Sequence, residues 1–413
     1  MMGKTKTTQQ STSLHTEKTV YSILIIIGLS HLLNDALQAV IPAMFPILEQ
    51  SLGLTFTQLG LIAFTLNMIS SVMQPLVGLV ADRRPMPYAL PLGLLSSTIG
   101  MFGLAFAPNF WWIILCVVFI GLGSAIFHPE GSRVAFLAAG PHRGLAQSIY
   151  QVGGNAGQAL APLITALILV PLGQVGAIWF TLVGGLAIIF LLYIARWYAV
   201  EMNIFTRNTA KVNQRQERKR IPKPIKNALI VLVFLVFARS WYASSIGNFY
   251  AFYTIKFYGL SIAQSQIYIF TFLLMGAVGT FLGGPLADRF GKRQVILWSL
   301  IIPAPLAIIL PHVGQILAII LLAAIGLILT SSFSVSVVYA QELMPGNIGT
   351  MSGLIVGLGF GMGAIGSVAL GSLIDWIGLA PTLILTSFLP LLGFLTYLLP
   401  TDETINQWNK ETV

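Results

Sequence analysis

Charged side chains are scarce in this sequence. Of its 413 residues, 22 are Lys or Arg and 13 are Asp or Glu, which together make 8% of the chain, whereas 56% of the residues are apolar. A soluble globular protein has about 25% charged residues, because its surface must be solvated. The scarcity of charge therefore excludes a soluble protein and indicates a membrane protein.

Cysteine and metal-binding patterns are also nearly absent. The one cysteine, Cys116, lies in an apolar run, so neither an intramolecular disulfide nor a metal site made of several thiolates can form. The five histidines have no ligand spacing, and no Gly-x4-Gly-Lys-Ser/Thr loop is present to bind a nucleotide. We therefore expect no metal, no cofactor, no direct use of ATP and no enzymatic activity.

Long stretches without charge predict an all-α membrane protein with twelve transmembrane helices. No Asp, Glu, Lys or Arg stands between Arg84 and Glu130, from Gly144 to Ala195, or from Gln294 to Gln341. Each stretch is long enough for two helical spans joined by a turn, since one span needs about 20 residues. The predicted spans are 20–43, 56–80, 88–106, 111–133, 145–170, 176–196, 228–255, 263–286, 293–310, 315–338, 349–374 and 380–399.

Basic residues collect on one side of these spans. With a cytoplasmic N-terminus, 20 of the 22 basic residues face the cytoplasm, Lys256 faces outside and Arg239 lies within a span. This asymmetry predicts a multi-pass protein of the cell membrane (the inner or plasma membrane) with both termini in the cytoplasm. The basic stretch 197–227 is either a solvated linker or a docking site for anionic lipid or a regulator. No folded module surrounds it, so nucleic-acid binding is not expected.

A repeated loop divides the chain into two halves. The loop after the second span begins at Gly78 and the loop after the eighth begins at Gly284, 206 residues later, which is half the chain. We predict a tail at 1–19, six-helix bundles at 20–196 and 228–399, the linker 197–227 between them and a tail at 400–413. We predict that the two loops form a conformational latch. The alternative is that their charges only fix the membrane topology. The latch residues are Gly78, Asp82, Arg83, Gly284, Asp288, Arg289, Gly291, Lys292 and Arg293.

The loop Gly-x-x-x-Asp-Arg-x-Gly-Lys-Arg at 284–293 resembles the signature of the major facilitator superfamily. The resemblance covers essentially the whole chain and implies two pseudo-symmetric six-helix bundles, the major facilitator fold. His31-Leu-Leu-Asn34-Asp35, Phe127-His128-Pro129-Glu130 and Gln341-Glu342 are similar to the fosmidomycin-resistance branch of that superfamily. That branch implies export of fosmidomycin, a small phosphonate antibiotic. The usual arginine in the middle of span four is Val117 here, so no role of that arginine carries over.

Polar residues inside the predicted spans are candidates for proton coupling. A charge at the bilayer centre costs about 2.5–3.5 kcal/mol, so such groups usually face a partner or a wet cavity. His31 and Asp35 are one helical turn apart, and Glu130 lies beside His128 at the end of span four. We predict that Asp35, His31, Glu130 and His128 couple transport to protons. The alternatives are a structural hydrogen-bond group at Asp35 and a structural pair of Glu130 with Arg133.

A second set of polar residues is predicted to bind the substrate. Arg239 is the one cation well inside the seventh span, and a guanidinium can hold a phosphonate or carboxylate with two hydrogen bonds. Its alternative role is an intramembrane ion pair with Asp35 or another acid. Span five carries Gln151, Asn155 and Gln158 on one polar face. The predicted substrate-binding residues are Arg239, Asn34, Gln38, Gln151, Asn155 and Tyr242.

Together these features predict a monomeric secondary transporter that exports a small drug in exchange for protons by alternating access within the lipid bilayer. An uptake carrier for a small organic anion or a sugar, and a broad multidrug exporter, are the alternatives. Both would share the fold and the loop signature.

Overall fold

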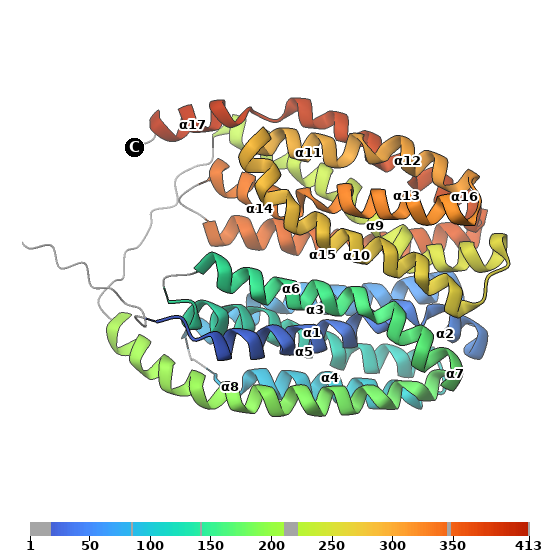
Figure 1. Ribbon diagram of the computed structural model, residues 1–413, viewed down its shortest axis with the longest axis horizontal. Helices are drawn as coiled ribbons and strands as arrows, with labels where there is room; N and C mark the ends of the chain where they lie inside the picture. Colours follow the sequence, from blue (N-terminus) through green and yellow to red (C-terminus); the bar gives the residue numbers. More distant parts are fainter. Residues whose placement is uncertain (1–17, 84–85, 141–142, 210–221, 345–347, 412–413) are drawn as a thin grey trace, which may run out of the picture.

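The computed structural model describes residues 18–83, 86–140, 143–209, 222–344 and 348–411, and all regular elements in these ranges are helical (Figure 1). The expectation of an all-helical membrane protein is therefore confirmed. The N-terminal half consists of α1 (Tyr21–Ala43), α2 (Phe45–Leu52), α3 (Phe56–Arg83), α4 (Ala89–Ala105), α5 (Phe110–Ala138), α6 (Arg143–Ile164), the π-helix η1 (Thr165–Leu169), α7 (Val170–Leu172), the 3-10 helix η2 (Gln174–Ile178) and α8 (Trp179–Thr209).

The C-terminal half repeats this arrangement with more breaks in its helices. It consists of α9 (Lys223–Tyr258), α10 (Ile262–Phe290), α11 (Lys292–Ile301), α12 (Pro303–Ile309), η3 (Leu310–His312), α13 (Gln315–Thr330), α14 (Ser332–Leu343), α15 (Ile348–Ile377), α16 (Leu379–Thr386), η5 (Leu389–Leu398) and α17 (Asp402–Glu411). Pro303 stands where α11 gives way to α12, because proline cannot donate the hydrogen bond that a continuous helix needs.

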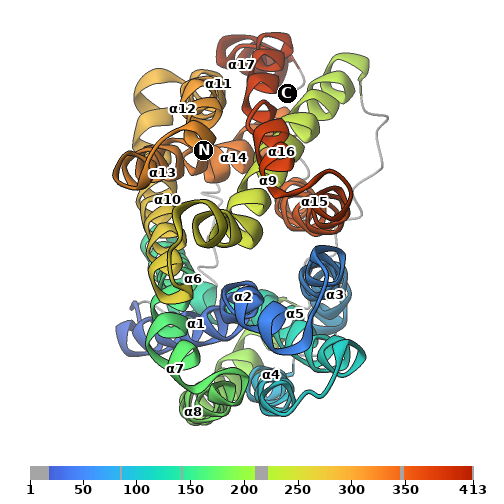
Figure 2. The ribbon, with the colours of Figure 1, turned by 90° about the vertical axis from the view of Figure 1, so that its right-hand side faces the viewer.

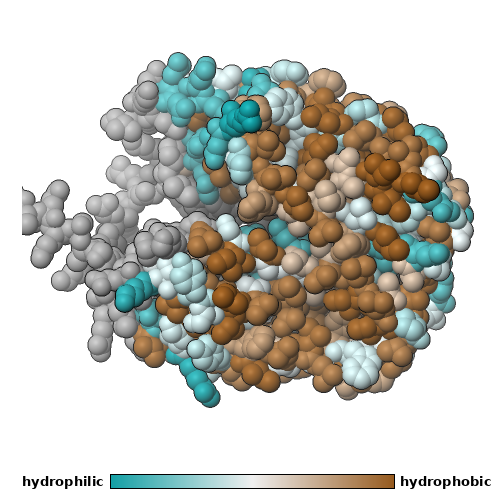
Figure 3. Space-filling view, viewed as in Figure 1, coloured by the Kyte–Doolittle hydropathy of each residue, from teal (hydrophilic) through white to brown (hydrophobic). Residues whose placement is uncertain are grey.

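Twelve apolar helical segments confirm the predicted number of spans. Eleven are long and apolar enough to cross a membrane in the described part of the chain, and the twelfth is the shorter helix Ala89–Ala105. A helix satisfies its backbone hydrogen bonds internally, which is why an apolar chain crosses lipid in this form. The exposed sides of these helices form a broad hydrophobic surface between more polar ends (Figure 3).

The two halves lie one against the other, with α1–α8 in one layer and α9–α17 in the other (Figures 1 and 2). We call the end of the bundle where α10 meets α11 the inner end, and the end where α3 begins at Phe56 the outer end. The charge distribution predicts that the inner end faces the cytoplasm. Figure 3 shows the surface hollowed between the two halves at the inner end.

Helices extend into segments that were predicted as linker and tail. Helix α8 continues to Thr209 and α9 begins at Lys223, so helix occupies both ends of the predicted linker 197–227. The predicted tail 400–413 contains α17, whose Ile405 is buried against the C-terminal half. Residues 1–17 of the predicted N-terminal tail and residues 210–221 of the linker lie outside the described residues.

Candidate functional site

Asp35 lies between two histidines in the interior of the N-terminal half. Its Oδ1 atom is 3.4 Å from Nε2 of His31, one turn earlier on α1, and 3.4 Å from Nε2 of His128 on α5. Both His31 and Asp35 are buried, with exposed fractions of 2% and 3%. We call these three residues the Asp35 cluster. The structure thus brings together three of the four residues predicted for proton coupling.

The other ring nitrogens of the two histidines face backbone carbonyl groups. His31 Nδ1 is 2.7 Å from the Tyr150 carbonyl oxygen, and His128 Nδ1 is 2.9 Å from that of Ser124. A carbonyl oxygen can only accept, so each Nδ1 carries the hydrogen. Each Nε2 then faces the carboxylate with a lone pair, which is repulsive, unless a cation or a proton is present. The three ligand atoms lie within 4.8 Å of one another, so one small cation, a proton or a metal ion, fits among them.

Two amides complete the surroundings of the Asp35 carboxylate. Gln158 on α6 donates to Oδ2 at 2.9 Å, and Asn34 donates to Oδ1 at 3.0 Å. Helix α6 comes this close because Gly153 and Gly157 contact the α1 backbone, where a Cβ atom would overlap the carbonyl oxygens of Gly28 and Leu32. Small residues at such a crossing allow two helix backbones to approach.

The polar residues of span five lie in different surroundings in the structure. Gln158, which was not among the predicted binding residues, is the member that reaches Asp35, whereas Gln151 is exposed and Asn155 is half-buried. Gln38 is also half-buried and donates to the Asn34 carbonyl group at 3.4 Å. The helical spacing predicted the face but not which of its side chains meets α1. Substrate binding by Gln38, Gln151 and Asn155 stays a prediction.

Glu130 does not join His128, contrary to the cluster expected from their proximity in sequence. Its buried carboxylate accepts a hydrogen bond from the Tyr198 hydroxyl of α8 at 2.7 Å, and Arg133 Nη1 lies 3.4 Å away. Residues two apart on a helix project in directions about 200° apart, so His128 and Glu130 face different neighbours. The alternative pair of Glu130 with Arg133 is the one that the structure contains.

Arg239 is a buried cation in the C-terminal half, with an exposed fraction of 6%. Its Nη1 atom donates to the Ser332 hydroxyl at 3.0 Å and lies 3.5 Å from the Ser336 hydroxyl, and its guanidinium lies 5.2 Å from the ring centre of Phe333. The Nη2 atom is buried and has no hydrogen-bond partner among the residues that the structure describes. Within the described residues no carboxylate lies at ion-pair distance, so the alternative pair with Asp35 is not formed.

Tyr242 follows Arg239 by one turn of α9, and its buried hydroxyl group has no hydrogen-bond partner in the described part of the chain. The sequence indicated Arg239 and Tyr242 as substrate-binding residues, which stays a prediction, but it did not indicate Ser332 and Ser336. Serines are common in a sequence of this composition, so only the packing of α14 against α9 reveals them.

In the second loop of the repeat, most contacts stay within the C-terminal half. The Lys292 backbone N–H donates to Asp402 at the start of α17 at 2.6 Å, and its Nζ atom pairs with Glu342 at 3.0 Å. Arg293 donates to the carbonyl groups of Thr396 and Tyr397. The Asp402 contact anchors α17, and the Arg293 contacts hold η5, roles that the loop signature did not predict.

The other residues predicted for the latch are exposed or lie outside the description. Asp288 and Arg289 are exposed, and the Arg289 guanidinium lies 5.1 Å from the ring centre of Phe290. Outside its own helix, no described atom lies within 4 Å of a Cβ placed at Gly284, whereas Gly279 and Gly283 of the same helix make close contacts with the α13 and α14 region. Gly291 has a φ of 88° and ends α10. The surroundings of Gly78 and the side chains of Asp82 and Arg83 lie outside the described residues.

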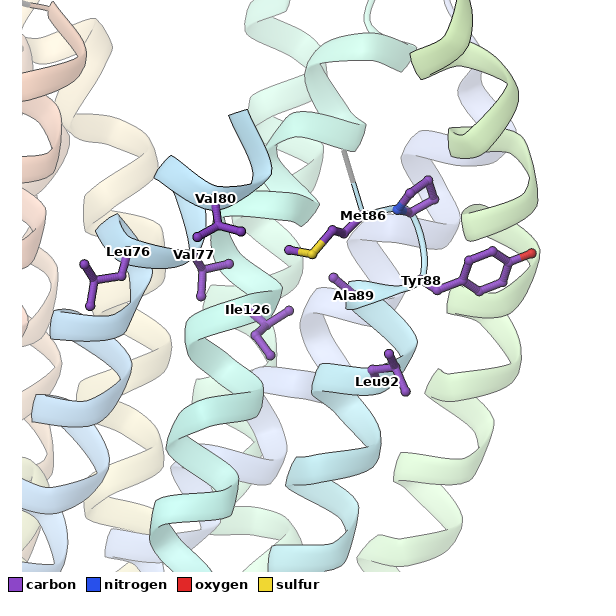
Figure 4. Close-up of a pocket in the computed structure, with 9 residues that line it drawn as sticks. Leu76, Val77, Val80, Met86, Tyr88, Ala89, Leu92 and Ile126 are labelled. Atoms are coloured by element: carbon purple, nitrogen blue, oxygen red, sulfur yellow. The ribbon is translucent and has the colours of Figure 1, made fainter. Parts of the chain in front are cut away.

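An apolar groove of about 560 Å³ opens on the surface of the N-terminal half (Figure 4). Leu76 and Val80 of α3 and Met86 and Leu92 near α4 line it, and none of the polar candidates does. A smaller groove of about 200 Å³ in the C-terminal half is lined by Leu282 and Leu286, which follow Leu76 and Val80 by 206 residues. The internal repeat therefore extends from the sequence to the surface of the structure.

The model of the Major Facilitator Superfamily matches residues 27–360. The chain belongs to this superfamily. It is 66% identical to the MFS-type transporter YfnC of Bacillus subtilis (strain 168) over 391 residues, which are 95% of this chain and 96% of the relative. It is 42% identical to the fosmidomycin resistance protein of Escherichia coli (strain K12) over 391 residues, which are 94% of each. The chain is thus a multi-pass membrane transporter for small molecules.

Solved structures agree with this fold. The nucleoside transporter NupG superimposes with a TM-score of 0.73 at 13% identity, covering 91% of this chain and 98% of NupG. A bacterial homologue of the human lysosomal transporter Spinster, in an inward-facing and occupied conformation, gives a TM-score of 0.68 at 19% identity, with 92% and 96% covered. At such identities the likeness shows the fold alone.

Proposed function

We propose that the chain is a secondary active exporter that expels a small anionic drug of the fosmidomycin type in exchange for protons. The observation that carries the proposal is the buried Asp35 carboxylate, held 3.4 Å from two histidine Nε2 atoms. This arrangement needs a positive charge to be stable, and a proton supplies it without further ligands. Binding and release of that proton are therefore the step that couples the protein to a proton gradient.

The exchange of drug for protons follows from the position of the Asp35 cluster between three helices. Helices α1, α5 and α6 all meet at the Asp35 cluster, so a change in its charge alters how the N-terminal half packs. In the outward-open state the drug leaves as a proton enters from outside; the two halves then rock about the centre, and the proton leaves to the cytoplasm. Glu130 is held by Tyr198 and Arg133 instead, and we assign it to the stability of the same half.

The surroundings of Arg239 favour an anionic substrate. The two serines occupy its Nη1 atom, while Nη2 is buried and has no partner in the described part of the chain. A buried donor without a partner costs free energy, about 1–3 kcal/mol or more for a charged group, which an incoming anion would recover. A phosphonate oxygen suits this donor, and the 42% identity to the fosmidomycin resistance protein supports a phosphonate drug.

The test compares Asp35→Asn with the unchanged protein in proteoliposomes loaded with fosmidomycin. We expect transport driven by a pH gradient to be lost, while exchange of labelled for unlabelled drug, which moves no net proton, continues. Glu49→Gln is a matched control, because Glu49 on α2 is half-buried and its side chain makes no described hydrogen bond or ion pair. Undiminished gradient-driven transport by Asp35→Asn would refute the coupling.

Substrate and direction are tested in an efflux-deficient host. Resistance to fosmidomycin alone is the expected result of expression. Resistance to many unrelated drugs would instead indicate a multidrug exporter, and accumulation of an organic anion or sugar would indicate an uptake carrier. Resistance to no drug would overturn export altogether.

A further inference from the structure

The beginning of α3, in the N-terminal half, is capped by a residue of the C-terminal half. Asp375 on α15 accepts hydrogen bonds from the backbone N–H groups of Phe56 at 3.1 Å and Thr57 at 2.7 Å, and from the Thr57 hydroxyl at 2.5 Å. The first N–H groups of a helix have no partner within the helix and carry a partial positive charge. A carboxylate at this position therefore binds the two halves together through both hydrogen bonds and charge.

Helix α3 caps only part of its own first turn. The Gln58 N–H donates to the Thr55 hydroxyl at 3.2 Å, and the Thr55 N–H donates to the Gln58 side chain at 3.0 Å, which is a capping box. The N–H groups of Phe56 and Thr57 are left for Asp375. If α15 moved away, these two donors would lose their protein acceptor.

Close packing surrounds the capped helix end. A Cβ atom at Gly371 of α15 would overlap the Phe56 carbonyl oxygen, and one at Gly60 of α3 would overlap that of Ser367. The ring of Phe56 also packs edge-on against Phe252 of α9, with ring centres 4.9 Å apart. Figure 2, which looks onto the outer end, shows α3 beside α15 at this crossing.

We infer that Asp375, Gly371 and the first turn of α3 form an outer clamp that closes the outer end, and that the clamp must separate when the protein opens outward. The two halves cannot part at this end without breaking the three hydrogen bonds to Asp375 and the glycine contacts. The clamp therefore sets the balance between closed and open states of the outer end. This inference goes beyond the proposed function, because it concerns neither the substrate nor the proton.

The test measures how fast a membrane-impermeant thiol reagent, added from outside, labels Asn248→Cys. Asn248 on α9 bonds Ser367 at 2.8 Å, and Ser367 lies two turns of α15 deeper than Asp375. Asp375→Ala is expected to raise the labelling rate about 2- to 30-fold, the range for loss of a helix cap. Asp375→Asn keeps one acceptor oxygen and should give a smaller rise. The parent chain, in which Cys116 is buried, gives the background.

A second variant tests the outer clamp by adding a methyl group, without removing a hydrogen bond. Gly371→Ala places a methyl group against the Phe56 carbonyl and is expected to raise labelling as Asp375→Ala does. Gly361→Ala is the matched control on the same helix, because no described atom outside the helix lies within 4 Å of a Cβ there, and its labelling should stay unchanged. Size-exclusion chromatography in detergent checks that each variant is folded. Unchanged labelling in both Asp375→Ala and Gly371→Ala, with folded protein, would overturn the outer clamp.

Discussion

Replacing Gly154 with alanine is expected to disturb proton coupling while the helices stay in place. A Cβ atom at this position of α6 would lie 2.6 Å from His31 Nε2 and 2.9 Å from Asp35 Oδ2. Ordinary contact begins at 3.4 Å, so the ring of His31 would have to withdraw by about 0.8 Å. The ring is also held by the 2.7 Å contact of Nδ1 with the Tyr150 carbonyl oxygen and by stacking on the Tyr150 ring, with ring centres 4.0 Å apart.

The size of the effect follows from this crowding. Forcing one extra methyl group into a packed interior costs about 1–3 kcal/mol. If that cost falls on the contact between His31 and Asp35, gradient-driven transport decreases about 5- to 150-fold. The assay is drug uptake into proteoliposomes with an acidic interior, in which proton exit drives the exchange.

A matched glycine separates this effect from the general effect of alanine. Among the described residues, no atom outside its own helix lies within 4 Å of a Cβ at Gly185 on α8, so Gly185→Ala should transport normally. Its helix gains about 0.5–1 kcal/mol from the lower flexibility of alanine. If Gly154→Ala showed the same dependence on the pH gradient as Gly185→Ala, the reasoning about the Asp35 cluster would be refuted.

Three further substitutions test the remaining contacts. Ser332→Ala removes a hydrogen bond from the charged Arg239 guanidinium, worth about 1.5–3 kcal/mol, that orients Arg239, so the KM for drug should rise about 10- to 150-fold in the transport assay, and an unchanged KM would contradict that role. Tyr198→Phe removes the hydrogen bond to the buried Glu130 carboxylate, worth about 1.5–3 kcal/mol; a lower Tm with intact proton coupling is expected, and lost coupling would move Glu130 into the proton pathway. Asp402→Ala leaves the N–H of Lys292 without its acceptor, so limited proteolysis should cleave α17 faster, and equal rates would show that the cap does not hold the helix.

Much of the fold could be predicted from the distribution of charge. Apolar runs between charged loops give the number of spans, because lipid admits only helices whose backbone is internally bonded. The 206-residue repeat predicted two similar halves, and the two surface grooves carry the same spacing. The His31 and Asp35 pair could also be predicted, since residues four apart on a helix share a face.

The partners of these groups were harder to predict. Sequence proximity grouped His128 with Glu130, but their side chains point to Asp35 and Tyr198 on different helices. The latch in the repeated loop stays a prediction, and the loop pattern gave no sign of the hydrogen bonds between α3 and α15 at the outer end, around Asp375. No local pattern marks Asp375 as the cap of a helix that begins more than 300 residues earlier in the chain.

The sequence by itself determined membrane residence, twelve helices in two related halves, and a short list of buried charged groups, because hydropathy and helical period act along one chain segment at a time. Only the tertiary structure decided that Gln158 rather than Gln151 reaches Asp35, and that Arg239 meets serines rather than a carboxylate. These choices depend on which helices cross and how closely. Residues such as Gly153 and Gly371 set that approach only once the opposing backbone is present.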